Sequence, residues 1–125
     1  MDFLVGIDLG TTACKVTVVA DDLTANTLTS APYPISAPHR GWAEQDPLAW
    51  GEAVDSTVQR ALDSAGVVRH DELTLSITGQ MHSLVLLDAD GRPARPAILW
   101  ADRRATAECI MIENRIPDIA AITGN

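Results

Sequence analysis

The stretch FLVGIDLGTTACKVTVV, residues 3–19, decides the fold because it reads as two short apolar strands joined by a tight polar turn. Apolar residues alternate with smaller or polar ones over residues 3–8, and a β-branched run follows over residues 16–19. Gly10 lies at the bend between the two runs. This arrangement predicts a β-hairpin at the start of the chain.

The turn of this hairpin contains the residue types that a phosphate site needs. Gly10 lets the backbone approach a ligand, and successive N–H groups with the hydroxyls of Thr11 and Thr12 can bind an anion. Asp8 ends the first strand, where a carboxylate can hold a hydrated Mg²⁺, and Lys15 adds positive charge. A plain hairpin turn, whose Asp and Thr side chains satisfy the backbone, explains the same residues equally well.

Size and charge restrict the class of protein. The chain has 125 residues, of which 46% are hydrophobic, so it can form one domain with its own core. Its net charge of −8 disfavours non-specific binding to nucleic acid or to anionic membranes. No apolar run approaches the roughly 18 residues of a membrane span, and no basic region precedes the first strand as in a signal peptide. Cys14 and Cys109 are predicted to be buried, reduced thiols, which indicates the cytoplasm.

Beyond the hairpin, hydrophobic periodicity and capping residues predict an α/β fold. The predicted elements are strands over 28–35, 73–78, 84–87 and 97–100, helices from Asp46 to Gly66 and from Asp102 to Pro117, and a helical turn over 119–122. The prolines within 28–35 place that strand at a sheet edge. Three strands, a helix, three strands and a helix indicate a mixed sheet covered by helices.

One group of candidate site residues follows the strand over 73–78. Gln80, Met81, His82 and Ser83 lie at its end, where ligands usually bind in an α/β sheet. Gln80 and His82 can each donate to or accept from a hydroxyl group. An ordinary loop histidine is the alternative interpretation of His82.

A second polar cluster follows the strand over 97–100. Trp100, Asp102, Arg103 and Arg104 suit a sugar, because an aromatic ring can cover its apolar face while charged groups bind its hydroxyls. A helix cap at Asp102 followed by two surface arginines is the equally plain alternative. The other arginines considered are expected to be solvated: Arg60, Arg69, Arg92, Arg95 and Arg115.

Several motifs occur together in an order typical of a known family. They are GIDLGTTACKV (6–16), GWAEQDPLAW (41–50), ITGQMHSLVLLD (77–88), RPAILWADRRATAEC (95–109) and ITGN (122–125). On these motifs residues 1–125 resemble the N-terminal domain of the FGGY-family carbohydrate kinases, most closely the xylulokinases among them. The opening motif alone is shared with Hsp70 and actin, whereas the GQMH and RPAILW stretches are more specific.

The resemblance implies a ribonuclease H-like fold of the actin, hexokinase and Hsp70 type. In this family two such domains flank a cleft in which ATP with Mg²⁺ phosphorylates a sugar hydroxyl. For the xylulokinases the substrate is D-xylulose and the product is D-xylulose 5-phosphate. The implied partner is therefore a small-molecule sugar.

The resemblance also assigns roles to individual residues. The first phosphate loop is matched by Asp8, Gly10, Thr11, Thr12 and Lys15, with Asp8 acting on Mg²⁺ through water. The sugar-side residues are matched by Met81 and His82, with Gln80 beside them, and by Trp100 with Asp102. Many xylulokinases have Gly where this chain has Ser83, and WNDGR where it has WADRR, so kinases of the same family for L-ribulose, glycerol or gluconate stay open as alternatives.

The family's catalytic base and adenosine pocket lie downstream of any match to this chain. We therefore expect no catalytic residue within residues 1–125, and no useful kinase activity from this chain alone. It is expected to be the N-terminal part of a longer enzyme, with the C-terminal domain absent. A natural non-catalytic sugar-binding module is one alternative, and an actin-like or Hsp70-like ATPase is another. Apolar surface left exposed is expected to favour a homodimer or other self-association.

Overall fold

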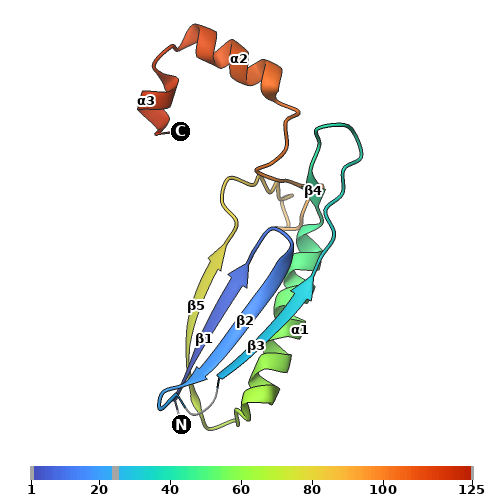
Figure 1. Ribbon diagram of the computed structural model, residues 1–125. Helices are drawn as coiled ribbons and strands as arrows, with labels where there is room; N and C mark the ends of the chain where they lie inside the picture. Colours follow the sequence, from blue (N-terminus) through green and yellow to red (C-terminus); the bar gives the residue numbers. More distant parts are fainter. Residues whose placement is uncertain (1, 24–25, 125) are drawn as a thin grey trace.

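The hairpin forms the centre of a four-stranded sheet in the computed structural model, which describes residues 2–23 and 26–124 (Figure 1). The strands of this sheet are β1 (Asp2–Leu9), β2 (Ala13–Ala20), β3 (Asn26–Pro32) and β5 (Glu72–Gly79), in the order β3-β2-β1-β5. β1 pairs antiparallel with β2 and parallel with β5, so the predicted mixed sheet is confirmed. The proline-containing strand β3 lies at an edge, as predicted.

Helix α1 (Pro47–Ala65) begins and ends where the capping residues predict. The Asp46 carboxylate accepts a hydrogen bond from the Leu48 amide at 2.9 Å, and Pro47 occupies the first turn, where no intrahelical N–H partner is needed. Gly66 ends the helix in the left-handed conformation, with φ of 72°.

The core lies between α1 and one face of the sheet. The buried residues of the sheet are Phe3, Val5, Ile7, Cys14, Val16, Val18 and Ala20, and those of the helix are Ala53, Thr57 and Ala61. They follow the period-2 and period-3.6 patterns of the sequence, so each element turns one apolar face inward. The opposite face of the sheet is open and carries a shallow hollow of about 320 Å³.

A small second sheet joins two distant motifs. It pairs β4 (Glu44–Gln45) antiparallel with β6 (Ala97–Ile98). The predicted strand over 84–87 is wrong: only isolated bridges occur there, from Leu84 to Ile98 and from Leu87 to Pro93. All four residues of that stretch are exposed, so no core face fixes a strand register.

The end of the chain departs from prediction. Helix α2 (Thr106–Arg115) begins later than expected: Asp102 Oδ1 accepts from the Arg104 amide as a helix cap would, but Oδ2 bonds to the distant Ala43 amide and the helix starts only at Thr106. α2 and the predicted turn, α3 (Ile119–Thr123), extend away from the sheet, so α1 is the helix that covers it (Figure 1). Cys109 is consequently exposed, and only Cys14 is buried as predicted. The motif over 122–125 ends on a residue outside the described part of the chain.

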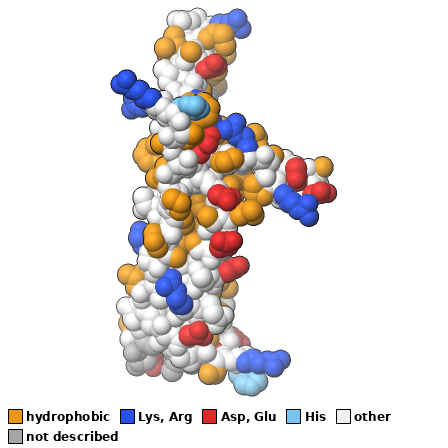
Figure 2. All heavy atoms as spheres, turned by 90° about the vertical axis from the view of Figure 1, so that its right-hand side faces the viewer, with side chains coloured by type: hydrophobic (Ala, Val, Ile, Leu, Met, Phe, Trp, Pro, Cys, Tyr) orange, Lys and Arg blue, Asp and Glu red, His pale blue; other side chains and the backbone are white. Residues whose placement is uncertain are grey.

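Apolar side chains remain exposed on several elements, among them β5 and α2. On β5 they are Leu73, Leu75 and Ile77, and on α2 they are Ile110, Met111 and Ile112. Figure 2 shows hydrophobic side chains on the surface of the body and on the part that extends from it. Self-association through this surface stays a prediction. Within the described residues no helix is long and apolar enough to cross a membrane.

Candidate functional site

The turn after β1 and the segment after β5 meet at one end of the sheet. They meet because β1 and β5 are parallel neighbours, with Leu9 opposite Gly79. A pocket of about 360 Å³ opens there, lined by Thr11, Gly79, Gln80, Met81, His82 and Trp100. The structure thus brings residues of both motifs that are predicted to contact a sugar to the turn over residues 10–12 that is predicted to bind phosphate, called the phosphate-loop turn below.

The carbonyl groups of the turn are held by hydrogen bonds from the rest of the domain. Four successive carbonyls accept such bonds: Leu9 from Gln80 N (3.0 Å), Gly10 from the Tyr33 hydroxyl, Thr11 from Gln45 Nε2 (2.8 Å) and Thr12 from Tyr33 N (3.2 Å). The amide N–H groups of Thr11 and Thr12 have no partner among the described residues. Fixed carbonyls and unpaired amides in one tight turn form a nest that suits an anion such as phosphate.

Tyr33 is the only tyrosine of the chain and supports this turn twice, through its amide and its hydroxyl. Its side chain is buried, and burial, together with the nearby Cys14 and Asp8, raises the pKa of Tyr33 to about 12. The phenol is therefore a neutral donor to the Gly10 carbonyl throughout the neutral range. Sequence reasoning did not identify Tyr33, because its partners, Gly10 and Thr12, lie in a turn more than 20 residues earlier in the chain.

Asp8 and Lys15 lie next to this turn, on the open face of the sheet. Lys15 Nζ is 3.5 Å from Asp8 Oδ2, and both side chains are about half exposed. A Cβ added at Gly10 would lie 3.8 Å from both Asp8 oxygens and 3.3 Å from the Ala13 carbonyl, so glycine keeps this approach open. One accessible carboxylate fits Mg²⁺, which keeps several waters and takes few protein ligands. The described residues contain no group of three or more metal-ligating side chains.

The residues that are predicted to contact a sugar present apolar and polar groups to the pocket. Met81 and Trp100 are 74% and 58% exposed. His82 has φ of 61°, a left-handed conformation that costs energy for a residue with a side chain and is often found at functional sites. The Trp100 indole Nε1 donates to Thr11 Oγ1 at 3.2 Å, so the sugar-side motif and the phosphate-loop turn are in direct contact.

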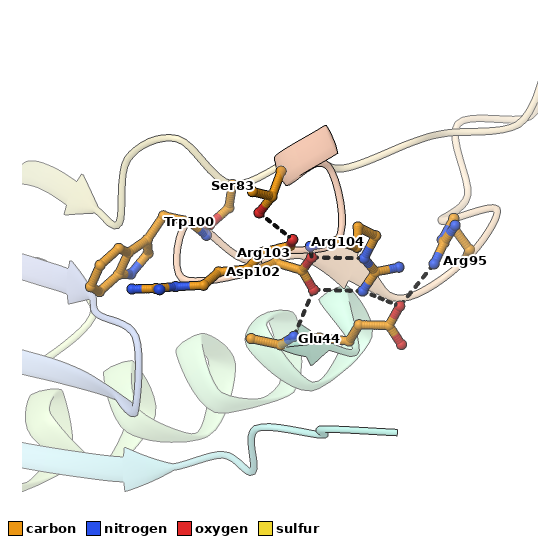
Figure 3. Close-up of polar contacts among 9 residues, drawn as sticks. Glu44, Ser83, Arg95, Trp100, Asp102, Arg103 and Arg104 are labelled. Atoms are coloured by element: carbon orange, nitrogen blue, oxygen red, sulfur yellow. Dashed lines mark hydrogen bonds and ion pairs between the residues drawn. The ribbon is translucent and has the colours of Figure 1, made fainter. Parts of the chain in front are cut away.

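Asp102 is the centre of a buried cluster of charges (Figure 3). Its Oδ2 accepts from the Ala43 amide at 2.6 Å and from Arg104 at 2.7 Å, and its Oδ1 accepts from the Arg104 amide and Nε at 2.8 Å each. Arg104 also reaches Glu44 at 2.8 Å and stacks over the Trp42 ring at 3.6 Å from the centroid. These bonds, above all those from Arg104, hold the pKa of Asp102 well below its usual range.

This cluster changes how Asp102 and the arginines are interpreted. The carboxylate of Asp102 has about four acceptor sites, and all four are used inside the chain, so a direct sugar contact would require one bond to be exchanged. That contact stays a prediction. Arg104 is not a surface arginine, and the expectation that Arg95 is merely solvated is wrong because it pairs with Glu44 at 2.8 Å.

The cluster also connects two motifs that lie far apart in the sequence. The β4–β6 pairing sets Glu44 opposite Ile98, and Leu99 N donates to the Ala43 carbonyl at 2.9 Å. Trp100 follows directly, so its position depends on this pairing. Sequence reasoning missed Glu44 and Gln45 as site residues. In the sequence they are two polar residues before a helix cap, and only the fold shows that both are buried.

Comparison with known proteins identifies the family of the chain. Over residues 3–125 the chain matches the model for the N-terminal domain of the FGGY family of carbohydrate kinases. The xylulose kinase of Escherichia coli (strain K12) is 40% identical over 121 residues, which cover 97% of this chain and 25% of that protein. The chain thus spans about a quarter of the length of the curated relatives it matches.

Solved structures give the same result. The xylulose kinase from Rhodospirillum rubrum has a TM-score of 0.84 at 29% identity, over 94% of this chain and 24% of that one. The gluconate kinase from Lactobacillus acidophilus has a TM-score of 0.80 at 30% identity, over 91% and 23%. The predicted ribonuclease H-like class, of the actin and hexokinase type, is confirmed by these neighbours. From its sheet, its site and the family match across residues 3–125, the chain belongs to the FGGY family of carbohydrate kinases, in the N-terminal domain.

Proposed function

We propose that residues 1–125 are the first of two domains of an ATP-dependent sugar kinase that converts D-xylulose to D-xylulose 5-phosphate. The observation that supports this proposal is the contact between Trp100 and Thr11 in one pocket, because an aromatic side chain that suits a sugar lies beside a turn that suits phosphate. A sugar bound against Trp100 then has its hydroxyl near the group to be transferred. We choose D-xylulose as the proposed substrate because a xylulose kinase is 40% identical to this chain.

The residues of the site have separate tasks in this proposal. The Thr11 and Thr12 amides and hydroxyls bind phosphate oxygens, and Lys15 offsets part of their charge. Asp8 holds the water shell of Mg²⁺, which neutralises charge on the phosphates when it is bound with ATP. Gln80 and His82 bind sugar hydroxyls, while Met81 and Trp100 cover the apolar face of the sugar. We place the general base and the adenine pocket outside this chain, and the protein in the cytoplasm.

The test is direct binding of D-xylulose to the chain by calorimetry. We expect the exchange His82→Ala to weaken binding about fivefold, because one hydrogen bond in a pocket contributes on the order of 1 kcal/mol. His70→Ala is the matched control, since His70 lies in an exposed loop before β5 and should leave the affinity unchanged. Equal affinities of the two variants would remove His82 from the sugar site, and no binding by the unaltered chain would contradict the proposed function.

The same titration separates the sugar alternatives. L-Ribulose, glycerol and gluconate are the competitors to compare, and gluconate has a specific observation in its favour because a gluconate kinase is among the structural neighbours. Arg103, exposed after Trp100, adds a positive charge that an acidic sugar would use. Tighter binding of gluconate than of D-xylulose would replace the substrate assignment and leave the kinase class intact.

We expect the 125-residue chain alone to turn over no ATP above background when D-xylulose is present. The physical reason is that phosphoryl transfer needs a base within hydrogen-bond reach of the sugar hydroxyl, and the motif assignments place none here. Coupled detection of ADP measures this, with Asp8→Ala as the background control. Turnover that Asp8→Ala abolishes would contradict the two-domain proposal, whereas sugar binding without turnover also fits a non-catalytic binding module.

A further inference from the structure

Gln45 is a buried polar residue that none of the assignments above uses. It lies in β4, its residue surface is 3% exposed, and it stands between the phosphate-loop turn and the segment after β5. Its Nε2 donates to the Thr11 carbonyl at 2.8 Å. Its Oε1 accepts from the Trp50 indole at 3.0 Å and from Gln80 Nε2 at 3.3 Å. Three segments of the chain therefore meet on one amide group.

The orientation of this amide follows from its partners. The Trp50 indole N–H can only donate, and the Thr11 carbonyl can only accept, so the oxygen of Gln45 must face Trp50 and its nitrogen must face Thr11. Gln80 must then present its own NH₂ group to Gln45, which leaves Gln80 Oε1 as an acceptor on the other side. A single buried side chain thus fixes the direction of the neighbouring hydrogen bonds.

These bonds close into a ring beside the pocket. The members of this polar ring are Thr11, Gln45, Gln80, Ser83 and Trp100. Ser83 Oγ donates to Gln80 Oε1 at 3.4 Å and accepts from the Trp100 amide at 3.3 Å. The Trp100 indole returns to Thr11 Oγ1 at 3.2 Å and completes the ring. Three of its members also line the pocket: Thr11, Gln80 and Trp100.

The ring also sets the direction of the Thr11 hydroxyl. Because Thr11 Oγ1 accepts from the Trp100 indole, its own proton points to another partner. In the described residues no such partner bonds to it, so the proton is available to an oxygen bound in the pocket. Movement of Trp100 against a sugar would therefore redirect the Thr11 hydroxyl, which is a donor to phosphate. Binding of phosphate to that hydroxyl would in turn affect the position of Trp100.

We propose that Gln45 is a positioning residue that couples the two halves of the site, so that sugar and phosphate each strengthen the binding of the other. This inference rests on the proposed function for its ligands, and on the polar ring alone for the role of Gln45. By linkage, the factor by which phosphate raises sugar affinity equals the factor by which sugar raises phosphate affinity. Ordering of the shared ring by the first ligand supplies that factor.

The test compares Gln45→Glu with Gln59→Glu. The carboxylate at position 45 keeps both acceptor bonds but cannot donate to the Thr11 carbonyl, so it cuts the ring at one bond. Gln59 is exposed on α1, with Asp63 as its partner, and its exchange adds the same charge away from the site. D-Xylulose affinity is measured with and without saturating inorganic phosphate. The indole N–H resonances of the three tryptophans are recorded without any ligand.

We expect phosphate to raise D-xylulose affinity about fivefold or more in the unaltered chain and in Gln59→Glu. In Gln45→Glu we expect phosphate to leave D-xylulose affinity unchanged. The ligand-free Trp100 resonance should move to the position of a free indole only in Gln45→Glu. The inference would be overturned if folded Gln45→Glu kept both the Trp100 resonance and the effect of phosphate on D-xylulose affinity. It would also be overturned if this variant bound D-xylulose and phosphate equally more weakly but kept that effect.

Two further outcomes are kept apart by this design. If the unaltered chain binds no D-xylulose, the proposed function fails, yet the ligand-free Trp100 resonance still decides whether Gln45 holds the two segments together. If Gln45→Glu does not fold, Gln45→Met replaces it, because methionine has nearly the same shape and adds no charge. A Trp100 resonance that stays in place in folded Gln45→Met would overturn the inference in the same way.

Discussion

Replacement of Asp102 by alanine is expected to lower the free energy of unfolding by about 3 kcal/mol. The carboxylate is almost fully buried, with 3% of the side chain exposed, and it accepts bonds from two backbone amides and twice from the Arg104 side chain. Its removal leaves the Ala43 amide without an acceptor and deprives the Arg104 guanidinium of its nearest anion. Thermal or urea unfolding of the chain measures the change.

Asp90→Ala is the matched control for this exchange. Asp90 lies in an exposed turn, 76% exposed and 3.8 Å from Arg92, so its loss should cost less than about 0.5 kcal/mol. Similar stabilities of the two variants would mean that the Asp102 cluster does not hold the β4–β6 region together. Asp102→Asn keeps the shape and some acceptors, and it should fall between the two.

The Asp102 carboxylate also makes the free energy of unfolding depend on pH in the acid range. Because the pKa of Asp102 is lowered in the folded chain, its contribution is complete above the ordinary Asp pKa of about 4. The contribution is lost as the pH falls below that value toward the lower folded pKa. Asp102→Ala should therefore be less stable at neutral pH, and its stability should fall less steeply below pH 4.

Local signals in the sequence were enough for the main sheet and its helix. Alternation over residues 3–8 placed Phe3, Val5 and Ile7 on one face, and Asp46 with Pro47 and Gly66 marked the ends of α1. The strand predicted over 84–87 does not form, and the helix predicted from Asp102 begins only at Thr106. The stretch over 84–87 is exposed, so no buried face fixes a strand there, and the Asp102 carboxylate bonds to the distant Ala43 amide as well as to Arg104.

The candidate site divides along the same line. Residues that would contact ligands lie in short motifs, so Thr11, Met81, His82 and Trp100 were predicted and do line one pocket. Residues that hold those motifs in place come from other elements, and nothing in the sequence around them indicates their partners in the turn. Gln45 and Tyr33 belong to this second group, and only the fold reveals that both bond to the phosphate-loop turn.

The hydroxyl of Tyr33 is expected to ionise near pH 12, about two units above a free tyrosine, and the fold should lose stability over that range. Burial favours the neutral phenol, so its contribution is complete below pH 10 and is lost as the pH rises toward 12. Two pKa units correspond to about 3 kcal/mol. Because the chain has one tyrosine, phenolate absorbance follows this single group.

Tyr33→Phe separates ionisation from packing, because it keeps the ring and removes only the hydroxyl. At neutral pH it should cost about 1 kcal/mol through the lost bond to the Gly10 carbonyl, and its stability should change less between pH 10 and 12. Titration of Tyr33 near pH 10 in a chain that is still folded would contradict this account. Since the phenolate would place a negative charge against Gly10 O, ionisation should also loosen the turn that offers its amides to phosphate.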